Sequence, residues 1–236
     1  MKEALTHRGP PYDRLFFDCD STLCSIEGLD ALGNRAGFAA ELIPITQAAM
    51  EGRLDLTTAY AERLALLQPD QTAVDWLTRQ YQECLTPGAV ALVNALQQAG
   101  KQVHIISGGI LQALLPLAAP LNIPITHIHA VSLQFNGDGS YNNYDAASPL
   151  CQQHGKAVIC RQLLGNGEHG AFIGDGITDL EAAAAGIDFI GFGGVVRRSR
   201  VEAAATVYSS ESDISRLLPL LLTPAELQRT GFSPQD

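Results

Sequence analysis

The sequence predicts an α/β protein: a three-layer, doubly wound parallel sheet with a small bundle of helices inserted after the first strand. Two observations support this fold class. An apolar run too short for a helix, residues 15–17, stops abruptly on Asp18 and Asp20, and such uninterrupted apolar strands are typical of parallel sheets covered on both faces. From residue 87 onward, further short apolar runs alternate with helical patterns, which is the order expected of a Rossmann-like core.

The composition is that of a folded, acidic protein. A chain of 236 residues that is 46% hydrophobic can bury a full core, which excludes disorder. The net charge of −10 argues against nucleic acid or an anionic membrane as a partner, because both require a basic face. Five scattered cysteines indicate reduced thiols and a cytoplasmic location. We expect no membrane segment, because residues 1–14 lack an apolar signal-type core and the apolar run 217–222 contains Pro219.

The insert after the first strand has the pattern of a helical domain. From residue 25 to 86 the chain is rich in Ala, Leu, Glu, Gln and Arg at helical spacing. Breaks near Gly52 and Pro69-Asp70 indicate three or four helices. This stretch is too long for a simple connection. We therefore predict a cap domain, residues 25–86, and a core domain made of residues 1–24 and 87–236.

The other elements are expected in chain order around this insert. Residues 1–13 should form a loose lead-in to the first strand at 14–18. Apolar runs and helical spacing then predict strands at 102–106, 125–131, 170–173, 188–192 and 206–208, and helices at 89–99, 110–118, 155–164, 179–185, 197–204 and 211–222. Residues 133–144, with Asn136-Gly137-Asp138-Gly139 at the centre, predict a hairpin.

Polar residues follow three of the predicted strands. Asp18 and Asp20 follow the first, Ser107 the second, and Asp175 and Asp179 the fourth. Each group alone could be an ordinary turn after a strand. The carboxyl ends of parallel strands meet at one edge of a sheet, however, so together they predict a shared site. Four carboxylates at one edge repel one another and would need a cation, and hard oxygen ligands favour Mg²⁺.

The same residues suit the transfer of a phosphoryl group. Asp18 would be the nucleophile, because a carboxylate is ionised at neutral pH and can form an acyl phosphate. Asp20 would protonate the leaving oxygen and later accept a proton from water. No Walker-type glycine loop is present. Donors to the phosphoryl oxygens would be the Ser107 hydroxyl, the backbone N–H groups of Gly108 and Gly109, and the ammonium of Lys156.

These motifs resemble those of a known family. The order DCDST, ISGG, Lys156 and GDGITD is similar to that of the haloacid dehalogenase superfamily of phosphatases, over residues 14–210. The stretch DCDSTLCSIEGLD, followed by AMEGRLDLTTAYAERLALL, resembles the phosphoserine phosphatase branch, whose helical cap lies between the first two motifs. The resemblance implies that Asp18 is the phospho-acceptor and Asp20 the acid and base. It also implies Mg²⁺ ligands from Asp18, the backbone of Asp20, and Asp175; Asp179 is a further ligand candidate that could instead cap a helix.

The resemblance also implies how the cap holds the substrate. Glu27 would accept the substrate's ammonium group and Arg63 would pair with its carboxylate, although Arg53 is an alternative. Further candidates for substrate contact are Thr22, Met50, Gly108, Gly109 and Thr178. Met50 could equally fill a gap in the core. Thr178 stands where some relatives carry Asn, but its hydroxyl remains available to a phosphate.

Together the motifs predict a Mg²⁺-dependent phosphomonoesterase that hydrolyses O-phosphoserine through an aspartyl-phosphate. Three alternatives stay open: transfer of the phosphoryl group to an alcohol such as homoserine, hydrolysis of another small phosphate such as phosphoethanolamine or phosphoglycerate, and a silent binding protein. The third is disfavoured because none of the acids is missing. The expected partner is a small phosphate ester, and the sequence does not reveal the oligomeric state.

Overall fold

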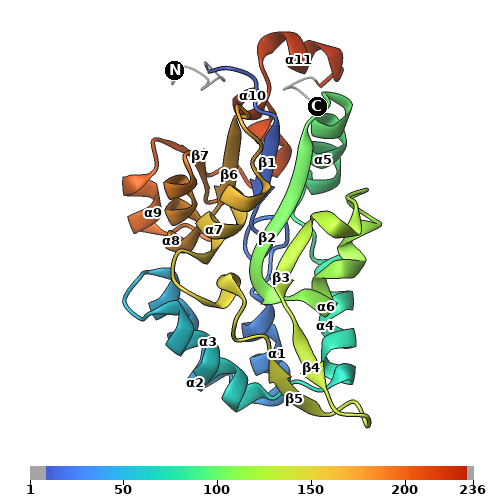
Figure 1. Ribbon diagram of the computed structural model, residues 1–236, viewed down its shortest axis with the longest axis vertical. Helices are drawn as coiled ribbons and strands as arrows, with labels where there is room; N and C mark the ends of the chain where they lie inside the picture. Colours follow the sequence, from blue (N-terminus) through green and yellow to red (C-terminus); the bar gives the residue numbers. More distant parts are fainter. Residues whose placement is uncertain (1–8, 233–236) are drawn as a thin grey trace.

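The computed structural model describes residues 9–232, apart from the side chain of Met50. Within this range the core is a six-stranded parallel sheet in the order β3-β2-β1-β6-β7-β8 (Figure 1). Its strands are β1 (Arg14–Phe17), β2 (Gln102–Ile110), β3 (Ile128–Val131), β6 (Gly170–Gly174), β7 (Asp188–Phe192) and β8 (Val207–Ser209). The strand order changes direction at β1: β2 and β3 follow on one side of it, and β6, β7 and β8 follow on the other. The predicted doubly wound sheet is confirmed, and ligands bind at such switch points.

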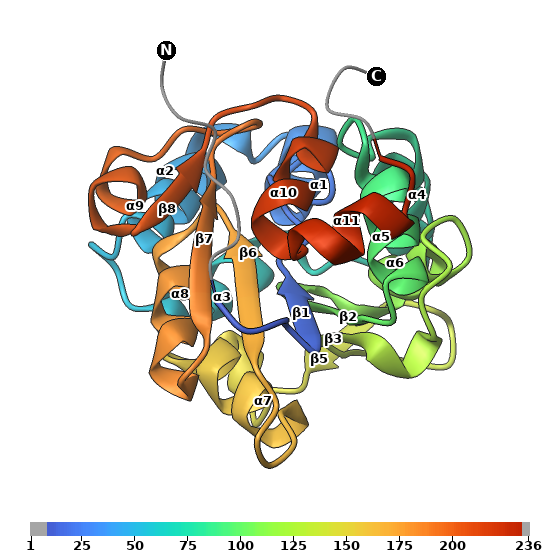
Figure 2. The same ribbon diagram turned by 90° about the horizontal axis from the view of Figure 1, so that it is seen from above.

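Helices cover both faces of this sheet. Figure 2 shows α5 and α10 on one side of β1 and α7 on the other. Leu15, Phe16 and Phe17 are fully buried as a result, which explains their uninterrupted apolar run. The core helices are α5 (Ala89–Gln98), α6 (Leu111–Leu114), α7 (Gly155–Leu163), α8 (Ile177–Leu180), α9 (Ser199–Ala204), α10 (Leu218–Leu221) and α11 (Pro224–Arg229). Short 3-10 helices are η1 (Leu115–Ala118), η2 (Ile125–His127), η3 (Pro149–Cys151), η4 (Glu181–Ala185) and η5 (Ile214–Leu217).

The insert between β1 and α5 is helical, and we call it the cap. It contains α1 (Gly28–Ala36), α2 (Ala39–Met50), α3 (Leu56–Leu67) and α4 (Gln71–Glu83). Asp55 and Asp70 begin α3 and α4, because each side chain accepts a backbone N–H of the first turn. The helix breaks thus fall where Gly52 and Pro69-Asp70 predicted them. We propose residues 25–86 as the bounds of the cap. Across residues 9–232, the helices are too short or too polar to cross a membrane.

Two further contacts define how the cap is attached. The predicted hairpin, β4 (Leu133–Phe135) and β5 (Tyr141–Tyr144), lies beside the cap (Figure 1). The Tyr144 ring is 5.3 Å from the Tyr60 ring, and the Gln71 N–H donates to the Gly139 carbonyl. The two chain connections between core and cap also touch: the Ser25 N–H donates to the Cys84 carbonyl at 2.7 Å. The cap therefore leaves and rejoins the core at one place.

The structure corrects three element predictions. The Ser107-Gly108-Gly109 stretch is not a turn, because β2 continues through a register shift until Ile110 pairs with Val131. The strand predicted at 125–131 begins with the turn η2, in which the His127 N–H donates to the Pro124 carbonyl. The helix predicted at 211–222 begins only at Ile214, because the Asp213 side chain caps it.

Two predictions concern the chain ends. Residues 1–8 of the predicted lead-in lie outside the described range. Tyr12, within the lead-in, is not loose: it is buried and its hydroxyl donates to Asp188 at 2.7 Å. The sequence did not predict α11, which begins with a reciprocal cap between Thr223 and Glu226.

Candidate active site

The candidate site lies where β1 and β6 end side by side. The Asp18 N–H donates to the Ile173 carbonyl at 2.9 Å, which extends the β1–β6 ladder by one residue. Asp175 follows β6 directly. Ser107, near the end of β2, lines the same pocket as Asp18 and Asp175. The structure therefore brings together the three polar strand ends that the sequence singled out.

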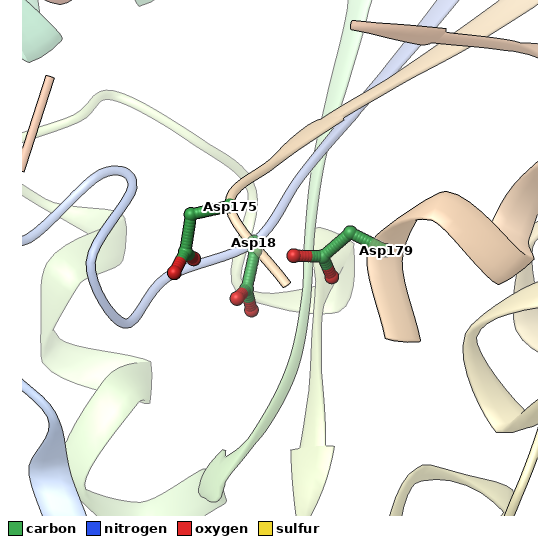
Figure 3. Close-up of side chains that lie close together, drawn as sticks. All are labelled: Asp18, Asp175 and Asp179. Atoms are coloured by element: carbon green, nitrogen blue, oxygen red, sulfur yellow. The ribbon is translucent and has the colours of Figure 1, made fainter. Parts of the chain in front are cut away.

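Three of the predicted metal-binding carboxylates converge. Asp18, Asp175 and Asp179 point toward a common space (Figure 3), and one oxygen from each lies within 4.8 Å of the others. All three side chains are buried. Asp179 is in the first turn of α8, where its Oδ2 also accepts the Gly176 N–H at 2.8 Å. Among the described residues, the Asp20 carboxylate does not belong to this cluster.

The electrostatics of the cluster fit a divalent cation. Burial and the nearby Asp179 charge hold the pKa of Asp18 well above its usual range. Burial and the Glu27 carboxylate raise the pKa of Asp175 to about 7. In the described part of the chain, Asp18 Oδ1 is buried and lies 2.8 Å from the Lys156 ammonium. Three buried carboxylates whose oxygens converge are the donor set that a hard cation such as Mg²⁺ prefers.

Lys156 supplies positive charge beside these acids. Its Nζ lies 2.8 Å from Asp18 Oδ1 as an ion pair and donates a hydrogen bond to Asp179. Burial alone would lower the pKa of Lys156, but the charges of Asp179 and Asp18 outweigh it and raise the pKa. Gly155 makes this position possible, because a Cβ there would lie 1.6 Å from the Pro149 carbonyl oxygen. The close approach brings the start of α7 into the site.

Asp20 is held by a cap residue that the sequence did not reveal. The hydroxyl of Tyr81, in α4, donates to Asp20 Oδ1 at 2.6 Å. Burial and the Asp18 charge raise the pKa of Asp20 to about 7, against the opposing effect of the Tyr81 hydrogen bond. A carboxyl with this pKa can both give and take a proton near neutral pH. Tyr81 had no distinguishing signal, because at helical spacing it is typical of a buried core residue.

The candidate phosphate-binding residues divide into two groups. Ser107, Gly108 and Thr178 line the pocket with Lys156. Gly109 and Thr22 lie behind this layer: the Gly109 N–H donates to Ser107 Oγ at 3.0 Å, and the Thr22 hydroxyl donates to Asp175 at 3.3 Å. Gly109 therefore orients the serine, and Thr22 orients a carboxylate. The side chain of Met50 lies outside the described part of the chain.

The cap contributes the opposite wall of the pocket. This wall carries charged, phenolic and apolar side chains: Glu27, Asp30, Arg63, Tyr60, Leu29 and Leu56. Burial and the Asp20 charge raise the pKa of Glu27 to about 7, against the opposing charge of Arg198. Arg63 is buried and donates to the Ala59 carbonyl and the Thr46 hydroxyl. Arg53 is exposed and pairs with Glu51, so of the two arginines only Arg63 faces the site.

Arg198 is a second residue that the sequence reasoning missed. Its Nε donates to Asp175 at 2.7 Å, and its terminal nitrogen donates to Glu27 at 2.8 Å. The guanidinium thus joins the metal-binding cluster of the core to the ammonium-binding candidate of the cap. Arg198 follows β7, and its place beyond another strand end was the signal that could have identified it.

Comparisons with known proteins agree with this geometry. Residues 12–186 match the family model of the haloacid dehalogenase-like hydrolases. The chain is 38% identical over 201 residues to the phosphoserine phosphatase of Mus musculus, covering 84% of this chain and 89% of that protein. It is 36% identical over 207 residues to the chloroplastic phosphoserine phosphatase of Arabidopsis thaliana, covering 85% and 70% respectively. A solved phosphoserine phosphohydrolase-like protein from Francisella tularensis superposes with a TM-score of 0.81 at 26% identity, covering 89% of this chain and all of that one.

Proposed function

We propose that this chain, which belongs to the haloacid dehalogenase-like hydrolases, is a Mg²⁺-dependent phosphomonoesterase that hydrolyses O-phosphoserine to serine and phosphate. One arrangement carries the proposal. The buried carboxylate of Asp18, beside the Lys156 ammonium, faces a pocket whose other wall offers a carboxylate, Glu27, and a guanidinium, Arg63. These groups complement the phosphoryl, ammonium and carboxylate groups of phosphoserine. The phosphoserine phosphatases among the relatives support the same substrate.

The reaction proceeds in two displacements. In the first, a carboxylate oxygen of Asp18 bonds to phosphorus, and the bond from phosphorus to the serine oxygen breaks. Asp20, protonated near its pKa of about 7, gives its proton to that leaving oxygen. In the second, Asp20 takes a proton from water, which attacks the phosphorus of the aspartyl-phosphate. Phosphate leaves and the Asp18 carboxylate is restored.

The surrounding charges make these steps possible. Lys156 and the Ser107 hydroxyl stand at the pocket wall, where they can donate to the phosphoryl oxygens. Asp18, Asp175 and Asp179 would hold the metal, with the Asp20 backbone as a further ligand. Bound Mg²⁺ would neutralise charge on the phosphoryl oxygens. Arg198 keeps Asp175 and Glu27 in place.

The cap provides the selectivity. Glu27 would accept a hydrogen bond from the substrate's ammonium. Arg198 and Ser21 both donate to its Oε1, so Oε2 is the oxygen that would receive this bond. Arg63 would pair with the substrate carboxylate, because its present acceptors are neutral groups that a carboxylate can outcompete. Both contacts form away from phosphorus, so they distinguish phosphoserine from other esters.

A substrate panel tests this function. Phosphoserine, phosphoethanolamine, phosphoglycerate and an aryl phosphate are each incubated with the protein and Mg²⁺, with and without homoserine. We expect phosphoserine to give the highest kcat/KM and free phosphate as the product. Preferred transfer to the alcohol would make the protein a phosphotransferase, and no turnover of any ester with intact phosphate binding would make it a silent binding protein.

The metal requirement is tested in the same assay. EDTA should abolish activity and Mg²⁺ should restore it. Ca²⁺ should inhibit, because its looser coordination would let both oxygens of Asp18 bind the metal and spoil the attack. Full activity with Ca²⁺ alone would contradict this arrangement.

We also propose a cytoplasmic location. Within residues 9–232 the five cysteines form no disulfide, including Cys19 and Cys24, whose sulfur atoms lie 3.7 Å apart. Close unpaired thiols suit a reducing compartment. Cell fractionation checks the location directly, and recovery outside the cytoplasm would contradict it.

A further inference from the structure

The hydroxyl of Tyr60 is a buried polar group without a hydrogen-bond partner among the described residues. The side chain is 0% exposed, so water does not replace the missing partner at the molecular surface. Buried hydroxyls in folded proteins are nearly always hydrogen-bonded, and an exception calls for an explanation. The position of Tyr60 in the candidate site suggests one.

Tyr60 belongs to the cap wall of the active-site pocket. It lies in α3, one turn before Arg63, and lines the pocket together with Glu27 and Asp20. Its ring is held from two sides, by the Tyr144 ring at 5.3 Å and by the Arg63 guanidinium at 5.6 Å. Packing of this kind fixes where the hydroxyl lies. The hydroxyl is therefore a fixed polar group within the pocket wall.

The neighbours of Tyr60 leave an unmatched donor on this wall. The other buried phenol near Asp20, that of Tyr81, already donates to Asp20. Burial raises the pKa of Tyr60 despite the opposing charge of Arg63, so the phenol stays neutral and keeps its proton. Arg63 adds further N–H donors, and among the described residues these donate to two neutral oxygens, the Ala59 carbonyl and the Thr46 hydroxyl. Together, the phenol and the guanidinium form a surface that requires an anionic acceptor.

We propose that Tyr60 is a specificity-determining residue whose hydroxyl donates a hydrogen bond to the carboxylate of the substrate, beside Arg63. This inference rests on the proposed phosphoserine phosphatase activity and extends it. The substrate's ammonium cannot accept a hydrogen bond. The phosphoryl group has its own donors on the core wall of the pocket, Ser107 and Lys156. A carboxylate offers about four lone-pair sites, and a bidentate guanidinium fills two of them.

A conservative substitution measured on two esters tests the proposal. Phosphoethanolamine is phosphoserine without its carboxylate, so the pair isolates that group. Tyr60→Phe should lower kcat/KM for phosphoserine about ten-fold, because a hydrogen bond to a charged group is lost, and should change phosphoethanolamine less than about two-fold. The Tm of the ligand-free variant should stay equal or rise, because the hydroxyl has no partner to lose.

Tyr12→Phe is the matched control. It also removes a phenol hydroxyl, but one that donates to Asp188 and does not line the pocket. This control should lower Tm and leave the ratio of the two kcat/KM values unchanged. The two variants therefore separate a hydroxyl that awaits a ligand from one that stabilises the fold.

Three outcomes overturn the proposal. Equal losses on both esters would mean that the hydroxyl acts on the phosphoryl group, no loss on either would mean that it contacts no substrate, and a lower Tm for Tyr60→Phe would mean that it has a structural partner. Failure of the proposed function is seen separately. In that case the unsubstituted protein itself would not hydrolyse phosphoserine with Mg²⁺.

Discussion

The two walls of the pocket differ in how completely their polar groups are paired. On the core wall, Lys156 contacts both Asp18 and Asp179. On the cap wall, Arg63 donates to neutral oxygens and Tyr60 has no partner in the described part of the chain. In the proposed function, the core wall performs the chemistry with groups that already pair with one another, whereas the cap wall selects the substrate with donors that a ligand would complete. Substitutions in the core should therefore affect every substrate, and substitutions in the cap only some.

The largest expected effect comes from the nucleophile. Asp18→Asn keeps the shape of the side chain but removes its charge, so turnover of every ester should fall by about 10⁴-fold or more. Circular dichroism should show an intact fold. Steady-state phosphate release measures the loss, with mass spectrometry to rule out deamidation. Substantial residual activity would contradict the aspartyl-phosphate mechanism. It would also contradict the assignment of the chemistry to the core wall.

The next largest effect concerns the charge balance of the core wall. Lys156→Met leaves Asp18 and Asp179 buried without their cation, which should lower the free energy of unfolding by about 3–5 kcal/mol in the absence of metal. Mg²⁺ should restore part of this loss, because it brings positive charge to the same acids. Urea unfolding with and without Mg²⁺ measures both values. Equal destabilisation in the two conditions would mean that Lys156 acts through packing rather than charge.

A smaller and selective effect is expected on the cap wall. Glu27→Gln and Arg63→Ala should each lower kcat/KM for phosphoserine by roughly ten- to a hundred-fold, the equivalent of one charge-assisted hydrogen bond. An aryl phosphate, which lacks both amino and carboxylate groups, should lose little. Arg53→Ala is the control, because Arg53 is exposed and pairs with Glu51. Equal losses on the two esters would show that the cap residues govern closure instead of selection.

The smallest expected effect is on stability rather than activity, and it comes from a histidine cluster in the core domain, outside the site. His104 stacks on His127 at 4.0 Å and lies 3.4 Å from His129, and burial and these two rings lower its pKa to about 3. The unfolded chain therefore binds a proton that the native state excludes, and stability falls as pH drops from 6.5 toward about 3.

His104→Gln should flatten this acid slope in unfolding titrations by up to one proton. Kinetic parameters at neutral pH should stay unchanged. An unaltered slope in His104→Gln would place the acid sensitivity elsewhere.

The sequence predicted the core wall better than the cap wall, for a physical reason. Asp18 and Asp175 directly follow buried strands and Ser107 lies in one, and parallel pairing then brings their positions together without further information. Tyr81 reaches the site only because of how the cap sits on the sheet, and that orientation has no local pattern. The histidine cluster was also missed, because His104 and His127 are apart in sequence and meet across β2 and the turn before β3.

The joined chain connections of the cap have a consequence for chain entropy. Residues 18–101 separate β1 from β2, and without residues 25–86 this connection would be roughly a quarter as long. The entropic cost of closing a loop grows only with the logarithm of its length. The insert therefore adds about 1 kcal/mol to the entropic cost of pairing these strands. The Ser25–Cys84 hydrogen bond brings the two ends of the insert together, so the strands need not move apart to hold it. A different insert could replace this one with little penalty to the sheet.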